Sequence, residues 1–138
     1  MKHLFVPYPI ALLASSEAAG FDEPCLGDYW TFGNKNKRAI IQHELITAAE
    51  DFSTINYDSV HRDPYFECPA PLYQQMIDWF EETHHKYIYA FRYNGRWQWK
   101  IDAEHGCDEF SKGDGFNTKY EALNKALEEA FKIIKKLN

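Results

Sequence analysis

The dipeptide Asn94-Gly95 constrains the fold of this chain more than any other part of its sequence. A two-residue hairpin turn needs positive φ at both central positions, and Asn-Gly is the pair that adopts this conformation most readily. Aromatic and aliphatic side chains are dense on either side of it, so the sequence predicts a β-hairpin from Tyr87 to Asp102. The turn also fixes the register, in which Tyr93 faces Arg96 and each earlier residue faces the corresponding later one.

This register divides the hairpin into two faces, because successive strand residues point to opposite sides of a sheet. One face is apolar and is expected to lie on the core; it comprises Ile88, Ala90, Trp97, Trp99 and Ile101, with Arg92 at its edge. The opposite face carries four rings on the first strand and polar partners on the second. We call the four rings, Tyr87, Tyr89, Phe91 and Tyr93, the aromatic face, and their cross-strand partners are Asp102, Lys100, Gln98 and Arg96.

Two amphipathic helices are predicted to flank this hairpin in the sequence. The first begins near Pro71 and places Tyr73, Met76, Ile77, Phe80 and His84 on one stripe at helical spacing. The second runs from Lys119 to Leu137, and Thr118 and Glu121 form a capping-box pattern at its start. Its continuous apolar stripe comprises Tyr120, Leu123, Leu127, Ala130, Phe131, Ile134 and Leu137. Residues 103–117 are expected to be mostly loop, with a brief third strand near Glu109-Phe110.

The N-terminal half is predicted to contain a short helix and a first hairpin. Pro9 suits a first helical turn and Gly20 suits the position after a helix, which places the helix from about Pro9 to Ala19. Cys25 to Phe32 and Lys37 to His43 have the composition of two strands, joined by a turn over residues 33–36. Residues 44–70 show no regular pattern and are interpreted as an irregular segment, in which we expect a short element whose type the sequence does not define, because structureless loops of this length are uncommon in small domains.

These elements predict one α+β domain over residues 1–138, in which antiparallel hairpins pack against two amphipathic helices. Its parts are an N-terminal helix and hairpin (1–43), the irregular segment (44–70) and a helix-hairpin-helix core (71–138). The C-terminal half follows an α-β-β-(β)-α order. Double-stranded RNA-binding domains share this order, but they carry a Lys cluster at the start of the last helix, where this chain has only Lys119 beside Glu121.

Composition excludes several classes of function. The net charge of −6 argues against nucleic-acid binding, because that affinity comes mainly from clustered Lys and Arg. Three cysteines without a CxxC pair are typical of reduced thiols, so a cytoplasmic protein is expected. The apolar stretch from Leu4 to Ala14 is similar to a signal peptide, but Pro7 and Pro9 interrupt it. No apolar run approaches the ~20 residues that span a bilayer, and no membrane association is expected.

The aromatic face, together with Arg96 and Lys100, is the candidate ligand-binding site. Aromatic rings stack on planar ligands, and a cation beside a ring contributes ~0.5–2 kcal/mol through cation–π contact. Two other interpretations stay open at this point. The rings could form a second buried core surface, or they could lie in a contact between copies of a homo-oligomer.

The other motif-like groups do not predict catalysis or a bound cofactor. Adjacent His84 and His85 point in different directions on a helix, and His105-Gly106-Cys107-Asp108 has no usual zinc spacing. His61-Arg62-Asp63 matches a kinase triplet without the other kinase motifs, and Gly113-Asp114-Gly115 lacks the spacing and the Lys of a phosphate-binding loop. We therefore expect no catalytic residue, no metal ligand and no cofactor.

Three further stretches carry a resemblance. They are Val6-Pro7-Tyr8 leading to Gly20-Phe21-Asp22-Glu23-Pro24-Cys25, then Ala70-Pro71-Leu72-Tyr73-Gln74-Gln75 with Ile77-Asp78-Trp79-Phe80, and finally Tyr120-Glu121-Ala122-Leu123 before the closing helix. Together they resemble a group of small uncharacterised proteins of gut Bacteroides-type bacteria and their phages and prophages. The resemblance implies a phage or mobile-element context and supplies neither an activity nor site residues.

The function expected from these features is that of a non-enzymatic binding protein, of the phage or prophage accessory kind. It would act through the aromatic face on a host protein or on a small planar, nucleotide-like ligand. Two alternatives are a nucleic-acid-binding module using the same face and a hydrolase whose catalytic groups are not evident in the sequence.

Overall fold

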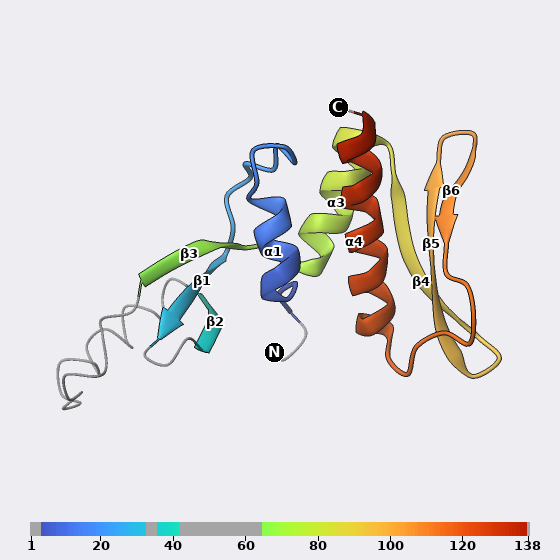
Figure 1. Cartoon of the computed structure of the whole chain (residues 1–138), viewed down its shortest axis with the longest axis horizontal. Helices are drawn as coiled ribbons and strands as arrows, with labels where there is room; N and C mark the ends of the chain where they lie inside the picture. The colour runs from blue at the N-terminus through green and yellow to red at the C-terminus, as the bar shows by residue number, and fades with distance from the viewer. Residues whose placement is uncertain (1–3, 33–35, 42–64, 138) are drawn as a thin grey trace.

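Two three-stranded antiparallel sheets lie on opposite sides of a layer of helices (Figure 1). The structure is a computed structural model and describes residues 4–32, 36–41 and 65–137. Its elements in chain order are α1 (Tyr8–Ala14), β1 (Gly27–Phe32), β2 (Asn36–Ile41), β3 (Tyr65–Ala70), α3 (Tyr73–His84), β4 (Tyr87–Tyr93), β5 (Arg96–Ala103), β6 (Gly106–Phe110) and α4 (Lys119–Leu137). This is the α+β fold expected from the sequence, with α3 and α4 packed against the second sheet.

The first sheet has the strand order β2-β1-β3 and contains the predicted N-terminal hairpin. Strand β1 begins at Gly27, two residues later than expected, and its pairing with β2 runs from Gly27↔Ile41 to Phe32↔Asn36. The turn residues 33–35 and the last two residues of the predicted second strand, 42 and 43, lie outside the described residues.

The expected short element within residues 44–70 is present at the end of this segment, and it is a strand. Tyr65–Ala70 forms β3 and pairs antiparallel with β1, whereas residues 42–64 lie outside the described residues. Pro69 lies within this strand although proline cannot donate a ladder hydrogen bond. Strand β3 is an edge strand, however, where a missing N–H is tolerated. Its pairing also shifts register opposite Tyr29 and Trp30, so β3 lacks the strict alternation that identifies a strand.

Helix α1 is shorter than predicted, since it ends at Ala14 and not at Ala19. The Ser15 hydroxyl donates a hydrogen bond to the Leu12 carbonyl at 3.0 Å, and the Ser16 hydroxyl donates to the Leu13 carbonyl at 2.8 Å. Such side-chain bonds compete with the backbone bonds that would continue the helix. Two consecutive serines therefore end α1 one turn earlier than the glycine that was expected to stop it.

The two halves of the chain share one buried cluster. The Val6 N–H donates to the Pro71 carbonyl at 2.9 Å, and the Tyr73 N–H donates to the Leu4 carbonyl at 3.1 Å. From β1, the Tyr29 hydroxyl donates to the Val6 carbonyl at 2.5 Å. These bonds attach the N-terminal segment to the start of α3 and bring α1 into the same core as α3 and α4.

The C-terminal half confirms the predicted α-β-β-β-α order and the predicted register. Asn94 and Gly95 take φ values of 52° and 77°, as the turn requires, and Tyr93 pairs with Arg96. The third strand, Gly106–Phe110, is longer than expected and pairs with β5. Helices α3 and α4 lie on one side of this sheet (Figure 1), which buries the predicted core residues Trp99 and Ile101.

Helix α4 has the predicted bounds, and its apolar stripe packs against α3. The rings of Phe80 and Phe131 meet edge to face at 4.9 Å between centroids, and Phe80 is fully buried. At the start of α4 the Glu121 N–H donates to the Thr118 hydroxyl oxygen at 3.2 Å, as expected for a helix cap. Helix α4 thus covers the side of the second sheet that carries Trp99 and Ile101.

The loop after β6 passes so close to β5 that a side chain at Gly115 would collide with it. Gly115 has a φ of +88°, and a Cβ there would lie 2.6 Å from Nε2 of Gln98 and 2.8 Å from the carbonyl oxygen of Trp97. The next residue, Phe116, exchanges two backbone hydrogen bonds with Trp97 at 2.8 Å. We expect Gly115→Ala to lower the free energy of unfolding by about 2–3 kcal/mol, because backbone strain and a steric clash combine.

Gly113→Ala is the matched control for this prediction. Gly113 has the same φ of +88°, but an added Cβ would meet nothing within 4 Å. This variant should lose only about 1 kcal/mol, from the backbone conformation alone. Equal losses in the two variants, measured by chemical denaturation, would contradict the close approach of the loop to β5.

Candidate functional site

The aromatic face is exposed, because the helices cover only the other side of the second sheet (Figure 1). The exposed fractions of Tyr87, Tyr89, Phe91 and Tyr93 are 36%, 39%, 38% and 63%. On the helix side of the same strand, Ile88 is only 4% exposed. Of the interpretations left open by the sequence, the second buried core surface is therefore excluded for these four rings.

A fifth ring, Phe110, extends the aromatic face and was missed from the sequence. Strand β6 places Phe110 opposite Lys100, which is itself opposite Tyr89, so these three side chains share one face. Phe110 is 52% exposed, and Nζ of Lys112 lies 5.9 Å from the centre of its ring. The available signal was the expected short strand near Glu109-Phe110, but without a register the side to which Phe110 points was not defined.

Lys100 is engaged by the protein's own acid. Its Nζ lies 3.3 Å from Oδ1 of Asp102, and the Tyr89 hydroxyl donates to Oδ2 of the same carboxylate at 2.9 Å. The hydrogen bond to Asp102 raises the pKa of Lys100, while partial burial and then the neighbouring Asp102 raise the pKa of Tyr89. The three groups form a compact polar cluster between the rings, in which the charge of Lys100 is balanced.

Arg96 is held at the other end of the face by neutral acceptors. Its guanidinium donates to Oδ1 of Asn117 at 2.7 Å and to the carbonyl of Gly115 at 3.0 Å. These bonds fix the side chain across the loop after β6 and leave its charge unbalanced. The structure thus brings all six predicted site residues to one face, although Arg96 and Lys100 differ in the charge that they offer to a partner.

Two adjoining hollows mark the turn end of this face. One, of about 340 Å³, has Phe91, Tyr93 and Phe110 among its walls. The other, of about 460 Å³, has Tyr93, Arg96 and Asp114 among its walls. Both include Tyr93 and Gln98 in their walls, so the two hollows adjoin at these residues.

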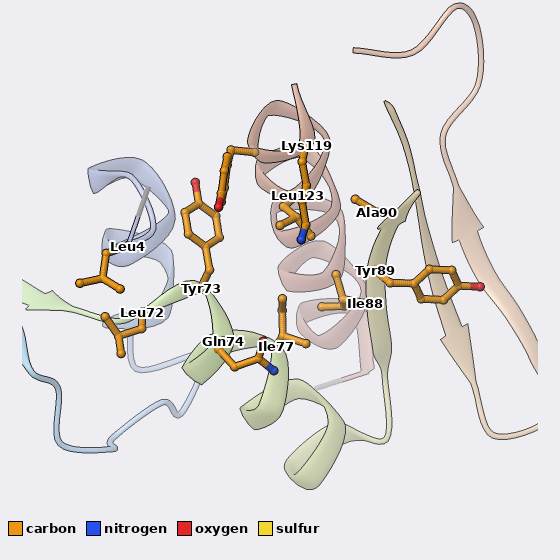
Figure 2. Close-up of a pocket in the computed structure, with 11 residues that line it drawn as sticks. Leu4, Leu72, Tyr73, Gln74, Ile77, Ile88, Tyr89, Ala90, Lys119 and Leu123 are labelled. Atoms are coloured by element: carbon orange, nitrogen blue, oxygen red, sulfur yellow. The ribbon is translucent and has the colours of Figure 1, made fainter. Parts of the chain in front are cut away.

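A separate pocket of about 440 Å³ lies on the helix side of the sheet, between α3, the start of α4 and β4 (Figure 2). Its walls are mainly apolar and include Leu4, Ile77 and Leu123. Figure 2 shows that the ring of Tyr89 points away from these residues, toward the opposite side of the sheet.

Tyr73, which also lines the pocket, donates its hydroxyl proton to Oδ1 of Asn124 at 2.6 Å, and burial raises the pKa of Tyr73 to about 12. Tyr73 is accordingly a structural residue that joins α3 to α4.

Two of the histidine-containing groups noted in the sequence, His84-His85 and His105-Gly106-Cys107-Asp108, lie together at the far end of the second sheet, whereas His61-Arg62-Asp63 lies outside the described residues. A hollow there includes His84, His85 and Lys86 from the end of α3 and residues 103–108 from the β5–β6 turn. Lys86 forms an ion pair with Asp108, and the exposed Cys107 thiol donates to the carbonyl of Glu109 at 3.3 Å. Within the described ranges, no group of three or more His, Cys, Asp or Glu side chains could hold a metal ion.

We expect His84 to make the stability of the protein depend on pH. Its Nε2 is buried without a hydrogen-bond partner among the described residues, and its ring packs edge to face on Trp79 at 4.9 Å. Burial, with help from Lys86 and His85, lowers the pKa of His84 below its ordinary value of 6.5. A base with a lower pKa in the folded chain takes up its proton more readily after unfolding. The contribution of neutral His84 to stability is therefore complete above pH 6.5 and is lost as the pH falls below that value.

We expect the thermal midpoint of the wild-type protein to fall more steeply than that of His84→Gln when the pH drops from about 7.5 to about 5.5. His105→Gln, a change at an exposed histidine, is the matched control and should keep the wild-type slope. Parallel curves for wild type and His84→Gln in scanning calorimetry would show that His84 does not carry this dependence.

Comparison with known proteins adds no relative: no family model, no curated protein and no solved structure matches the chain. None of the helices in the described part of the chain is long and apolar enough to cross a membrane.

Proposed function

We propose that this chain is a non-catalytic binding protein that contacts another protein through the aromatic face and Phe110. The observation that supports this proposal is the exposure of five rings, between 36% and 63% each, on one side of one sheet. Large exposed apolar patches on a folded domain mark interaction sites, and aromatic side chains dominate the energy of protein interfaces. The apolar core on the other side of the same sheet shows that the exposure is not a consequence of a loosely folded domain.

The size of the face favours a protein over a small planar ligand. The four rings of β4 span six residue steps, which corresponds to roughly 20 Å along a strand. Phe110 widens the patch by two strands. A single nucleobase or flavin-sized ring would cover only one or two of these side chains. A protein surface of ordinary interface size, about 800 Å² on each partner, would cover all of them.

The charges near the rings also favour a protein partner over a nucleotide-like ligand. A nucleotide-like ligand needs cations for its phosphates, but Lys100 is already paired with Asp102. The chain as a whole carries a net charge of −6. Among the described residues near this face, Arg96 is bound by neutral acceptors and Lys112 lies beside the Phe110 ring, and at the rim of a protein interface two such cations would suit acidic or hydrogen-bonding partner groups.

The same charges weigh against the nucleic-acid alternative. Double-stranded RNA-binding domains grip phosphates from the start of their last helix, yet the first turn of α4 carries Lys119 together with Glu121. RNA binding is nevertheless a distinct outcome of the test below, because retention of RNA would be strongly reduced by salt whereas an apolar protein contact would not.

Photo-crosslinking tests the proposal with a partner that is still unidentified. A photoreactive phenylalanine analogue replaces Phe110 on the face or, in the control, the exposed Leu12 of α1. Both proteins are irradiated in a lysate of a Bacteroides-type bacterium, which is the setting that the resemblance suggests. We expect one protein adduct at Phe110 that is absent at Leu12 and persists at high salt. Identical adducts at the two positions, or adducts that contain only nucleic acid, would contradict the proposal.

A further inference from the structure

Strand β4 forms an edge of the second sheet, whose order is β4-β5-β6. In the described part of the chain, no other segment pairs with the side of β4 that faces away from β5. Edge strands expose unpaired N–H and C=O groups and can add a further strand, so natural sheets usually protect them.

The hydrogen bonds on the side of β5 away from β4 show which residues of β4 direct their N–H and C=O groups to the open edge. Trp97 exchanges both of its backbone hydrogen bonds with Phe116, and the Trp99 carbonyl accepts from the Ser111 N–H at 2.9 Å. Both tryptophans therefore direct their backbone groups away from β4. Because backbone groups alternate along a strand, the even-numbered residues of β5 are the ones that bond to β4.

On β4, the partners of these even-numbered residues are the rings of the aromatic face, such as Tyr89 and Phe91. The residues between them, Ile88, Ala90 and Arg92, consequently direct their N–H and C=O groups to the open edge. Three evenly spaced backbone sites are thus available to another strand.

The two edges of the sheet are protected very differently. Strand β6 has five residues, contains Asp108 and Glu109, and its pairing with β5 is interrupted by a register shift. Strand β4 has seven residues, contains no proline and pairs with β5 without a shift. Its one charge is the exposed Arg92, whose guanidinium lies 6.0 Å from the ring centre of Trp97 and donates to the Gly95 carbonyl at 3.3 Å. Apart from this charge, β4 lacks the usual protections of an edge strand, which are short length, proline and a bulge.

The positions of the aromatic residues in β4 are symmetric about Ala90. It has an aromatic ring at every odd-numbered position, and the rings stand one and three residues from Ala90 on each side. A two-fold interface places the same surface on both partners, so it requires a pattern that matches itself when reversed. We infer that β4 pairs antiparallel with β4 of a second copy of this chain, in the register that sets Ala90 opposite Ala90.

This register gives favourable cross-strand pairs. On the outer side, Tyr89 faces Phe91 of the second copy and Tyr87 faces Tyr93, so every pair is aromatic. On the helix side, Ile88 faces Arg92 and the two alanines face each other. Each of the three pairs that involve Ile88, Ala90 and Arg92 exchanges two backbone hydrogen bonds, about six in all. A shift by one residue in each strand toward the N-terminus would set Lys86 against Arg92, which opposes two like charges.

The helix side leaves room for this pairing. Ile88 and Ala90 line the pocket of about 440 Å³ between α3 and β4 (Figure 2), and Ala90 is the smallest side chain of the strand. The pairing would join the two sheets into one and set the two aromatic faces side by side. Its backbone hydrogen bonds use the strand edge and its cross-strand ring pairs involve the aromatic face, whereas Phe110 belongs to the proposed binding surface and not to this pairing.

Ala90→Pro is the first test. The N–H that proline removes faces the open edge, so the ladder with β5 stays intact while the two central hydrogen bonds of the dimer are lost. We expect light scattering coupled to size exclusion to give a dimer for the wild-type chain and a monomer for Ala90→Pro, with cooperative unfolding retained. Phe110→Ala, which leaves the β4 edge unchanged, should remain dimeric and bind the purified partner more weakly in calorimetric titration, which separates this inference from the proposed function.

A charge exchange tests the register even if the proline variant does not fold. Tyr89→Lys/Phe91→Lys sets lysines opposite each other across the interface, and Tyr89→Glu/Phe91→Glu does the same with acids, so each double variant alone should be monomeric. Mixed in equal amounts, the two should form a heterodimer that salt weakens. A wild-type monomer at the highest attainable concentration, or homodimers of both charged variants, would overturn the inference.

Discussion

Phe80→Ala is expected to lower the free energy of unfolding by about 3–5 kcal/mol, the range typical of a fully buried phenylalanine. Phe80 is fully buried, and its ring contacts the ring of Phe131 across the interface between α3 and α4. Truncation leaves a cavity at the point where the two helices meet above the second sheet. Since small domains have a total stability of about 5–15 kcal/mol, this variant should be close to the limit of folding at 37 °C.

Phe110→Ala provides the matched comparison, because it removes the same side chain from a position that is 52% exposed. This change should cost no more than about 1 kcal/mol. Both variants are measured by urea denaturation with fluorescence detection. A loss at Phe110 as large as that at Phe80 would mean that the face is covered by the protein itself in solution.

The double variant Tyr89→Ala/Phe91→Ala should weaken binding of the crosslinked partner by about 30-fold or more, which corresponds to at least ~2 kcal/mol for a pair of central interface rings. These rings contact each other at 6.1 Å between centroids and lie in the middle of the face. Their loss removes apolar contact area and also frees Asp102, which accepts the Tyr89 hydroxyl. Calorimetric titration of the purified partner provides the measurement.

Leu12→Ala/Leu13→Ala is the control for this prediction. Leu12 and Leu13 are 48% and 42% exposed on α1, so the double change removes a similar amount of exposed apolar surface elsewhere on the molecule. We expect this variant to bind as the wild type does. Unchanged affinity in Tyr89→Ala/Phe91→Ala, or equal losses in both double variants, would be inconsistent with binding through the face.

The C-terminal half could be predicted from the sequence because its signals are local. Asn94-Gly95 determines the register of the hairpin, and the register decides which side chains share a face. Helix α4 combines a cap at Thr118 with an unbroken apolar stripe, so both its bounds and its buried side followed. The six candidate residues were brought together for the same reason, since all of them belong to that one hairpin.

The features that the sequence did not predict depend on non-local contacts. Strand β3 contains Pro69 and pairs with β1 across a register shift, so its pattern does not identify a strand. The face to which Phe110 points depends on the pairing of β6 with β5, and no turn signal as strong as Asn-Gly specifies that pairing. The exposure of the rings depends on which side of the sheet α3 and α4 cover, and this is a property of packing that alternation alone leaves undefined.

Hydroxyl-radical footprinting of the free and partner-bound protein tests binding through the aromatic face most directly, because the same experiment reports exposure and binding. We predict rapid oxidation of Tyr87, Tyr89, Phe91, Tyr93 and Phe110 in the free protein and strong protection of these five rings in the complex. Leu12 and Leu13, exposed on α1, should be oxidised at the same rate in both states. Protection of all five rings in the free protein, or oxidation unchanged by the bound partner, would contradict binding through this face.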